Sequence, residues 1–194
     1  MKGIMARVDQ ALFYENSIKR HGKNARGVAW SDGRRQRVRF KALLDAAGDI
    51  GRAVVVDAGC GFGDLCLYMR ETGRVPKRYI GIDLLDFMVK EARHRTKERV
   101  FRKDFLKDSL PRADWYFASG SFNLLTRFET VLAVKRCLDA SVRGIVFNLL
   151  EGRDEGGRYN YWRPSQIKKV CGSFGSVEIF SGYLDGDFTV KITL

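Results

Sequence analysis

A run of valines that leads directly into a glycine-rich turn constrains the fold of this chain most. The segment reads Val54-Val55-Val56-Asp57-Ala58-Gly59-Cys60-Gly61-Phe62-Gly63-Asp64. The β-branched valines favour a strand that is covered on both faces. Glycines at alternate positions allow a tight turn and leave no Cβ between the backbone and a ligand. The segment therefore predicts a buried strand, a nucleotide-binding turn and the start of a helix.

The spacing of the glycines separates two classes of nucleotide cofactor. Dinucleotide-binding turns have the pattern G-x-G-x-x-G. Gly59 and Gly61 fit its first two positions, but Asp64 stands at the third and Gly63 comes one residue early. Asp57 is unfavourable beside a phosphate, because like charges repel, whereas a cationic ligand would be stabilised there. The pattern argues against a nicotinamide-dependent oxidoreductase.

A second carboxylate follows at the end of the next predicted strand. Arg78-Tyr79-Ile80-Gly81-Ile82-Asp83 has the apolar character of a strand, and Asp83 lies twenty residues after Gly63. A carboxylate at this position can accept two hydrogen bonds from the hydroxyls of a ribose. Both nucleotide classes place one there. Asp83 is also a candidate N-cap for a helix over 84–95, and the two roles are compatible.

The turn resembles motif I of the class I S-adenosylmethionine-dependent methyltransferases, D-x-G-x-G-x-G, and two later segments resemble the same family in the same order. Residues 100–105 resemble the segment in which an acidic side chain accepts the adenine amino group, so Asp104 is the candidate acceptor and Phe105 the packing partner. Residues 114–123 resemble motif IV. They lack the N/D-P-P-Y/F pattern of enzymes that methylate exocyclic amines of bases or glutamine side chains, which argues against that subclass.

The resemblance extends over roughly residues 36–194 and implies S-adenosylmethionine as the cofactor. Arg39 resembles the arginine with which ubiquinone-pathway methyltransferases hold the cofactor carboxylate; Arg35 and Arg37 are competitors, and an exposed helix charge is the alternative for each. The expected cofactor-binding residues are Arg39, Asp57, Ala58, Gly59, Cys60, Gly61, Gly63, Asp83, Leu84, Asp104, Phe105, Ser119 and Gly120.

The expected fold class is α/β, a three-layer Rossmann-like methyltransferase fold. Strand patterns alternate with helical ones, which predicts a mostly parallel seven-stranded sheet with helices on both faces. The last two strands lack a helix between them and should form a C-terminal antiparallel hairpin. The expected strands cover residues 53–57, 79–83, 99–102, 115–118, 144–149, 176–181 and 188–194.

Residues 1–52 are expected to form a helical cap or substrate lid, with helices over 5–20 and 35–47, on a cofactor-binding core of residues 53–194. The two parts should make one structural domain. The acceptor candidates are Tyr14, Trp30, Phe122, Tyr159 and Tyr161. For Tyr14 and Trp30, the favoured alternative is a structural role, in which these aromatic side chains attach the leading segment to the rest of the domain. His21 is a candidate general base for a hydroxyl acceptor, although a surface residue is the simpler interpretation, and Asn123 would border the reacting methyl.

Charge gives a clue to the acceptor. The chain has a net charge of +12, and residues 1–52 hold 12 basic against 5 acidic residues. Such a segment can attract RNA or DNA, or equally an anionic metabolite. No RNA-binding module is recognisable, so a small-molecule acceptor is favoured over tRNA or rRNA. A non-catalytic basic module that binds RNA or protein is the rival; the carboxylates Asp57, Asp83 and Asp104 argue against it.

Other features of composition limit the compartment and the cofactors. No apolar run is long enough for a membrane span, and the N-terminus does not resemble a signal peptide. The four cysteines, Cys60, Cys66, Cys137 and Cys171, have no disulfide or metal spacing. We expect them to be buried thiols in a cytoplasmic protein. The only histidines, His21 and His94, are far apart in the sequence, and no metal site is expected; the oligomeric state is not predicted.

Overall fold

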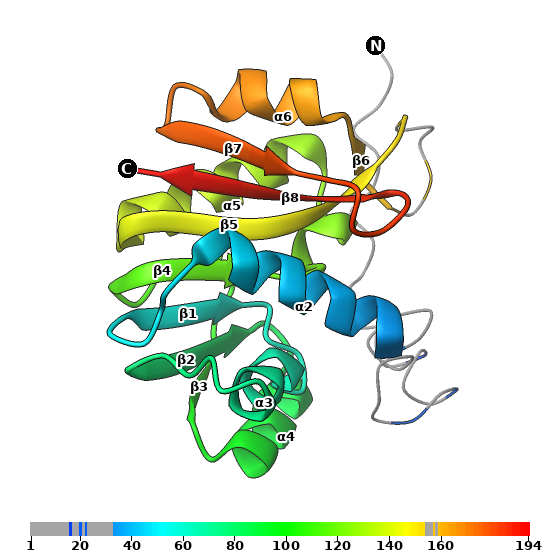
Figure 1. The fold of residues 1–194 in the computed structure, drawn as a ribbon. Coiled ribbons are helices and arrows are strands. Elements are labelled where there is room, and N and C mark those ends of the chain that lie inside the picture. Colours follow the sequence, from blue (N-terminus) through cyan, green and yellow to red (C-terminus); the bar gives the residue numbers. More distant parts are fainter. Residues whose placement is uncertain (1–15, 17–19, 21, 23–32, 154–156, 158) are drawn as a thin grey trace.

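The computed structural model describes residues 16, 20, 22, 33–153, 157 and 159–194. An eight-stranded sheet lies at its centre, with the strand order β3-β2-β1-β4-β5-β8-β7 and β6 beside β5 (Figure 1). The strands are β1 (Val54–Ala58), β2 (Arg78–Asp83), β3 (Arg99–Arg102), β4 (Ala113–Ala118), β5 (Ser141–Glu151), β6 (Tyr161–Trp162), β7 (Ser176–Phe180) and β8 (Asp187–Thr193). The helices are α2 (Gly33–Ala47), α3 (Asp64–Glu71), α4 (Asp86–Thr96), α5 (Arg127–Ala140), α6 (Pro164–Cys171) and the 3-10 turn η1 (Ser121–Leu124).

The sheet has the predicted mixture of parallel and antiparallel pairing. Strands β1 to β5 pair in parallel, whereas β8 runs antiparallel to both β5 and β7. The fold class is therefore confirmed, including the C-terminal hairpin. The structure adds the two-residue strand β6, which is too short to carry a periodic pattern in the sequence. Because β1 lies between β2 and β4, the chain reverses its direction of travel across the sheet at β1, where α/β proteins bind ligands.

Helices cover both faces of the sheet, and each face has its own apolar layer. Val55, Phe117 and Val146 pack with α2 and α3 in one layer. Alternate strand residues point the other way, into a layer that contains α5 and part of α6. Figure 1 shows α2 crossing the sheet in front of β4 and α5 behind β5. The central strands are thus covered on both faces, which explains the valine run.

The thiols and the leading helix agree with expectation where the structure describes them. All four cysteines are free and buried. Helix α2 begins at Gly33, two residues before the predicted start, and buries Phe40, Leu43 and Leu44 against the sheet. The predicted helix over 5–20 lies almost entirely outside the described residues. The division into a cap and a core remains a prediction.

Candidate cofactor site

A cavity opens at the carboxyl ends of β1, β2 and β4, the place predicted from the strand order. Helix α2 and the segment around Tyr159 contribute to its wall. Its lining residues are Gln36, Arg39, Phe40, Asp57, Gly59, Cys60, Gly61, Phe62, Asp64, Leu65, Asp83, Leu84, Leu85, Met88, Phe105, Ser119, Gly120, Ser121, Asn123, Leu124 and Tyr159.

The glycine-rich turn forms the floor of the cavity. Gly59, Gly61 and Gly63 have φ angles of 77°, 53° and 80°, a region that L side chains rarely adopt. A Cβ on Gly59 would stand 2.3 Å from the Cβ of Ser121, and a Cβ on Gly63 would stand 2.5 Å from Cγ2 of Thr96. The glycines are therefore required twice, by the backbone conformation and by the close approach of neighbouring segments.

Asp83 joins this turn to the end of β2. Its Oδ2 accepts a hydrogen bond from the Gly61 amide at 2.9 Å, and its Oδ1 accepts one from the Leu85 amide at 3.0 Å. Burial raises the pKa of Asp83, while the hydrogen bonds from the backbone amides oppose that shift. The carboxylate thus holds the turn and receives the amide that precedes α4, and it also lines the cavity.

Asp57 is the second carboxylate of the cavity wall. It is 2% exposed, and its Oδ2 accepts a hydrogen bond from the Tyr79 hydroxyl at 2.6 Å. Burial, with smaller contributions from Asp83 and Asp64, raises the pKa of Asp57 to about 7. Among the described residues, only Asp64 of these three forms an ion pair with a basic side chain, Arg95, at 2.8 Å.

The charge of this wall tests which cofactor fits. Asp57, which is buried beside the turn and has no basic partner in the described chain, would repel a pyrophosphate and stabilise a sulfonium or an ammonium group. Asp83 does not separate the two cofactor classes, because both place a carboxylate at the end of this strand. The helix that follows the turn also begins with an acidic residue, Asp64, where dinucleotide-binding folds present amides to phosphate. The wall therefore fits the predicted cationic cofactor.

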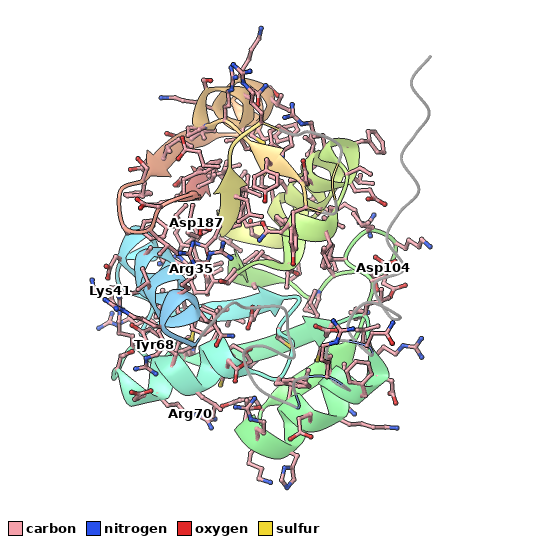
Figure 2. All side chains as sticks on the ribbon, turned by 90° about the vertical axis from the view of Figure 1, so that its right-hand side faces the viewer. Arg35, Lys41, Tyr68, Arg70, Asp104 and Asp187 are labelled. Atoms are coloured by element: carbon pink, nitrogen blue, oxygen red, sulfur yellow. The ribbon has the colours of Figure 1, made fainter. Side chains whose placement is uncertain are left out.

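Helix α2 and strand β8 supply a basic group on another wall. Of the three arginines considered on α2, only Arg39 lines the cavity. Its Nη2 forms an ion pair with Oδ1 of Asp187, whose side chain is fully buried at the start of β8. Arg35 lies 3.6 Å from the other oxygen of Asp187, and Figure 2 shows Arg35 and Asp187 adjacent to each other. Arg37 pairs instead with Glu71 on the surface.

Polar side chains line the cavity beyond β4. Ser119 Oγ donates a hydrogen bond to Asn148 Oδ1 at 2.8 Å, and Asn148 Nδ2 donates to Thr189 Oγ1 at 2.7 Å. Asn123 is 7% exposed, and its Oδ1 has no hydrogen-bond partner among the described residues. A buried carbonyl oxygen without a donor is costly, so this atom is available to a ligand with an N–H or O–H group.

Most of the predicted site residues meet at this cavity. The ones that line it are Arg39, Asp57, Gly59, Cys60, Gly61, Asp83, Leu84, Phe105, Ser119, Gly120, Asn123 and Tyr159. Ala58 and Gly63 build the frame of the turn without lining the cavity; the Ala58 carbonyl accepts a hydrogen bond from Ser121 Oγ at 2.7 Å. Tyr14, His21 and Trp30 lie outside the described residues.

Three predicted residues lie away from the cavity lining. Phe122 is fully buried in the core beneath Phe105, and Tyr161 belongs to the edge pairing of β5 with β6. The Oδ1 of Asp104 accepts the amide of Leu106 at 2.9 Å, so the carboxylate closes its own loop. Figure 2 shows Asp104 on the opposite side of the view from Asp187. Its contact with adenine stays a prediction.

Several lining residues were not anticipated from the sequence. Gln36 lies one helical turn before Arg39, and Phe40 follows Arg39 directly, so the i, i+3, i+4 spacing from Gln36 was the available signal. Asp187, Asn148 and Thr189 support the wall from strands far away in the sequence, and no local pattern marks them.

Comparisons with known proteins agree with this geometry. Residues 55–146 match the family described as "Methyltransferase domain". A search of curated proteins finds no match.

Among solved structures, magnesium protoporphyrin IX methyltransferase from Synechocystis PCC 6803 with bound SAH has 18% identity and a TM-score of 0.66, over 83% of each chain. A TehB-like SAM-dependent methyltransferase from Corynebacterium glutamicum has 21% identity and a TM-score of 0.65, over 94% of this chain and 97% of that chain. The pyocyanin biosynthetic protein PhzM has 14% identity and a TM-score of 0.71, over 93% of this chain and 61% of that chain.

The family match identifies residues 55–146 as a methyltransferase domain. The strand order and the glycine-rich turn agree with that match, and the fold is the one seen in S-adenosylmethionine-dependent methyltransferases of known structure. In the part of the chain that the structure describes, no helix combines the length and the apolar character needed to cross a membrane.

Proposed function

We propose that this enzyme transfers the methyl group of S-adenosylmethionine to an oxygen, nitrogen or sulfur atom of a small molecule. The observation that carries the proposal is the charge arrangement of the cavity, in which Asp57 and Asp83 face a ligand from one wall and Arg39 from another. The methionine end of the cofactor has a sulfonium and an ammonium group beside a carboxylate, so Asp57 and Arg39 complement its charges, and Asp83 is left for the ribose.

The roles of the wall residues follow from their contacts. Asp83 keeps lone pairs beyond those used by the Gly61 and Leu85 amides and can accept the ribose hydroxyls. Asp57, at the end of β1, would attract the positive end of the cofactor, and Arg39 its carboxylate. Phe105 would pack on the adenine ring with Asp104 nearby, as the resemblance implies.

The bound cofactor supplies an already activated methyl group, so the chain needs no covalent step of its own. The protein's contribution is alignment of the acceptor with the methyl carbon and exclusion of water. Asn123 is suited to orient the acceptor, because it lines the cavity and its buried Oδ1 lacks a partner in the described structure. Tyr159 would contact the acceptor from the loop after β5. A proton-accepting role for His21 remains part of this proposal.

The acceptor class rests on similarity in fold to enzymes that act on small molecules. Magnesium protoporphyrin IX methyltransferase and PhzM are named for such chemistry. The net charge of +12 favours a second candidate, a tRNA or rRNA methyltransferase, because basic surfaces attract phosphates.

Methyl transfer from radiolabelled S-adenosylmethionine separates the two candidates. The purified protein is incubated with a metabolite extract or with bulk RNA, and the products are separated by size. We expect label in a small-molecule product that chromatography separates from the unreacted cofactor, and much less of it with the Asp83→Asn variant. Label in RNA alone would replace the small-molecule acceptor by RNA. Absence of label from both, with cofactor binding intact, would contradict the proposed acceptor class as well.

A further inference from the structure

The ion pair between α2 and β8 contains a carboxylate that is almost fully buried. Asp187 is 1% exposed and Arg39 is 6% exposed. Burial raises the pKa of Asp187 and lowers that of Arg39, while the charge of each counters the shift of the other. Taking two charges out of water is costly, and a buried ion pair is often no more stabilising than apolar side chains of the same size. Attachment of α2 to the sheet therefore does not by itself explain why this ion pair is buried.

An exposed ion pair attaches the same helix without the cost of burying two charges. Arg37 on α2 makes two hydrogen bonds to Glu71 at the end of α3, at 2.7 and 2.6 Å, and both side chains are exposed. Apolar side chains of α2, among them Leu43 and Leu44, are fully buried. Helix α2 is thus attached without Arg39, and the buried pair, unlike the exposed Arg37 pair, includes a residue that lines the cavity.

The geometry of Asp187 controls where the Arg39 guanidinium points. A long, flexible arginine loses much conformational entropy when it is held in one orientation. Asp187, the first residue of β8, is anchored by the register of β8 against β5, and its amide donates to the Leu184 carbonyl at 3.2 Å. Arg35 also lies 3.6 Å from Asp187, so two guanidinium groups share one carboxylate. The group keeps a net charge of +1, which matches one ligand carboxylate.

We infer that Asp187 is a positioning residue, which holds Arg39 in the orientation that receives the carboxylate of the cofactor. The inference rests on the proposed function, since it assigns a residue to the binding of the same cofactor. It predicts that Asp187 acts on the amino-acid end of the ligand and leaves the nucleoside end unaffected.

Two ligands separate these ends. S-adenosylhomocysteine carries the carboxylate, whereas 5′-methylthioadenosine has the same nucleoside and no amino-acid group. In Asp187→Asn, we expect the affinity for S-adenosylhomocysteine to fall about tenfold. The affinity for 5′-methylthioadenosine should stay within about twofold, which also shows that the variant is folded. Glu71→Gln is the matched control: it breaks the exposed ion pair that Arg37 of α2 makes and should change neither affinity.

The outcomes that would overturn the inference are distinct. Equal losses for both ligands would indicate a structural role only. Tighter binding of S-adenosylhomocysteine would mean that Asp187 merely neutralises Arg39, since its removal leaves more positive charge. An unchanged affinity would mean that Arg39 needs no positioning. Failure of the wild-type protein to bind either ligand would contradict the proposed function itself.

A double replacement keeps the test valid if Asp187→Asn does not fold, because an unpaired buried arginine is strongly destabilising. Arg39→Met with Asp187→Leu removes both charges and restores apolar packing. This variant should bind 5′-methylthioadenosine normally and lose affinity for S-adenosylhomocysteine to the same extent as Arg39→Met alone. Wild-type affinity for S-adenosylhomocysteine in the double variant would overturn the inference.

Discussion

The two sides of the cavity are constructed in different ways. On the β1–β2 side, the turn over 59–63 and the carboxylates Asp57 and Asp83 come from two short segments and are fixed by backbone geometry. On the α2–β8 side, Arg39 depends on Asp187, and Asn148 depends on Thr189, 41 positions away. The first side is a local motif, whereas the second is an assembly of distant strands. The difference explains why one side can be recognised in the sequence and the other cannot.

The largest effect is expected from filling the space above Gly59. In Gly59→Ala, the new methyl would stand 2.3 Å from Ser121 Cβ on a backbone with a φ of 77°. We expect the free energy of unfolding to fall by about 3 kcal/mol, measured by urea denaturation. Gly73→Ala is the control, with a similar φ of 69° but nothing within 4 Å of the new methyl. It should lose about 1 kcal/mol. Equal losses would contradict the close-approach argument.

Titration of Asp57 tests the cost of the buried carboxylate. Its pKa rises from 3.8 to about 7 on folding, so the folded protein binds a proton there that the unfolded chain releases. The stability of the cofactor-free protein should therefore fall as the pH rises from about 4 to about 7, and then level off. Asp57→Asn should remove this dependence and stabilise the protein at pH 8 by on the order of 3 kcal/mol.

A second variant sharpens the pH measurement. The Tyr79 hydroxyl donates to Asp57 and favours its charged form. Tyr79→Phe should thus move the upper end of the pH dependence to higher pH, as followed by thermal unfolding across a pH series. Identical pH profiles for the wild type and Asp57→Asn would show that another group is responsible.

Loss of the Asp83 charge should weaken cofactor binding without unfolding the chain. Asp83→Asn keeps one acceptor oxygen for the turn but removes the charge that strengthens hydrogen bonds to ribose. We expect the affinity for S-adenosylhomocysteine to fall about 10- to 100-fold in a calorimetric titration. Asp139→Asn, near the exposed end of α5, is the control and should have no effect. Near-normal affinity in Asp83→Asn would refute the ribose assignment.

The smallest effect is expected from a change on the α2–β8 side of the cavity. Thr189→Val keeps the shape of the side chain but removes the hydroxyl that accepts from Asn148. The unfolding free energy should drop by about 1 kcal/mol, with cofactor affinity unchanged and methyl transfer reduced if Asn148 holds Ser119 in place. Thr193→Val on the same strand is the control and should leave the unfolding free energy, the cofactor affinity and the rate of methyl transfer unchanged. Weaker cofactor binding in Thr189→Val would show that the two sides of the cavity are coupled.

The sequence predicted the parts of the fold and site that depend on local pattern. The valine run, the glycine turn and Asp83 lie where their spacing placed them, and each predicted strand overlaps an observed one. The boundaries shifted by a few residues at most, since strand ends are set by pairing. Strand β5 extends to Glu151 because β6 and β8 pair along its end.

The remaining features depend on contacts between distant segments. Asp187 lies one residue before the predicted strand over 188–194 and was not expected at the site, because a sequence does not show that an aspartate will face an arginine on α2. Phe122 was expected beside the acceptor, yet its position in η1 directs the ring into the core, next to Phe147. The sequence places Asp104 just after β3, but it does not show where the carboxylate points. In the structure, the carboxylate accepts the amide of Leu106 in its own loop.

The most direct test of the account is a calorimetric titration of the purified protein with S-adenosylhomocysteine, with NAD as the parallel ligand. A wall that carries Asp57 and Asp83 and an opposing Arg39 should bind S-adenosylhomocysteine with micromolar affinity and should not bind NAD. Binding of NAD in place of S-adenosylhomocysteine, or of neither, would contradict the charge complementarity on which the cofactor site is assigned.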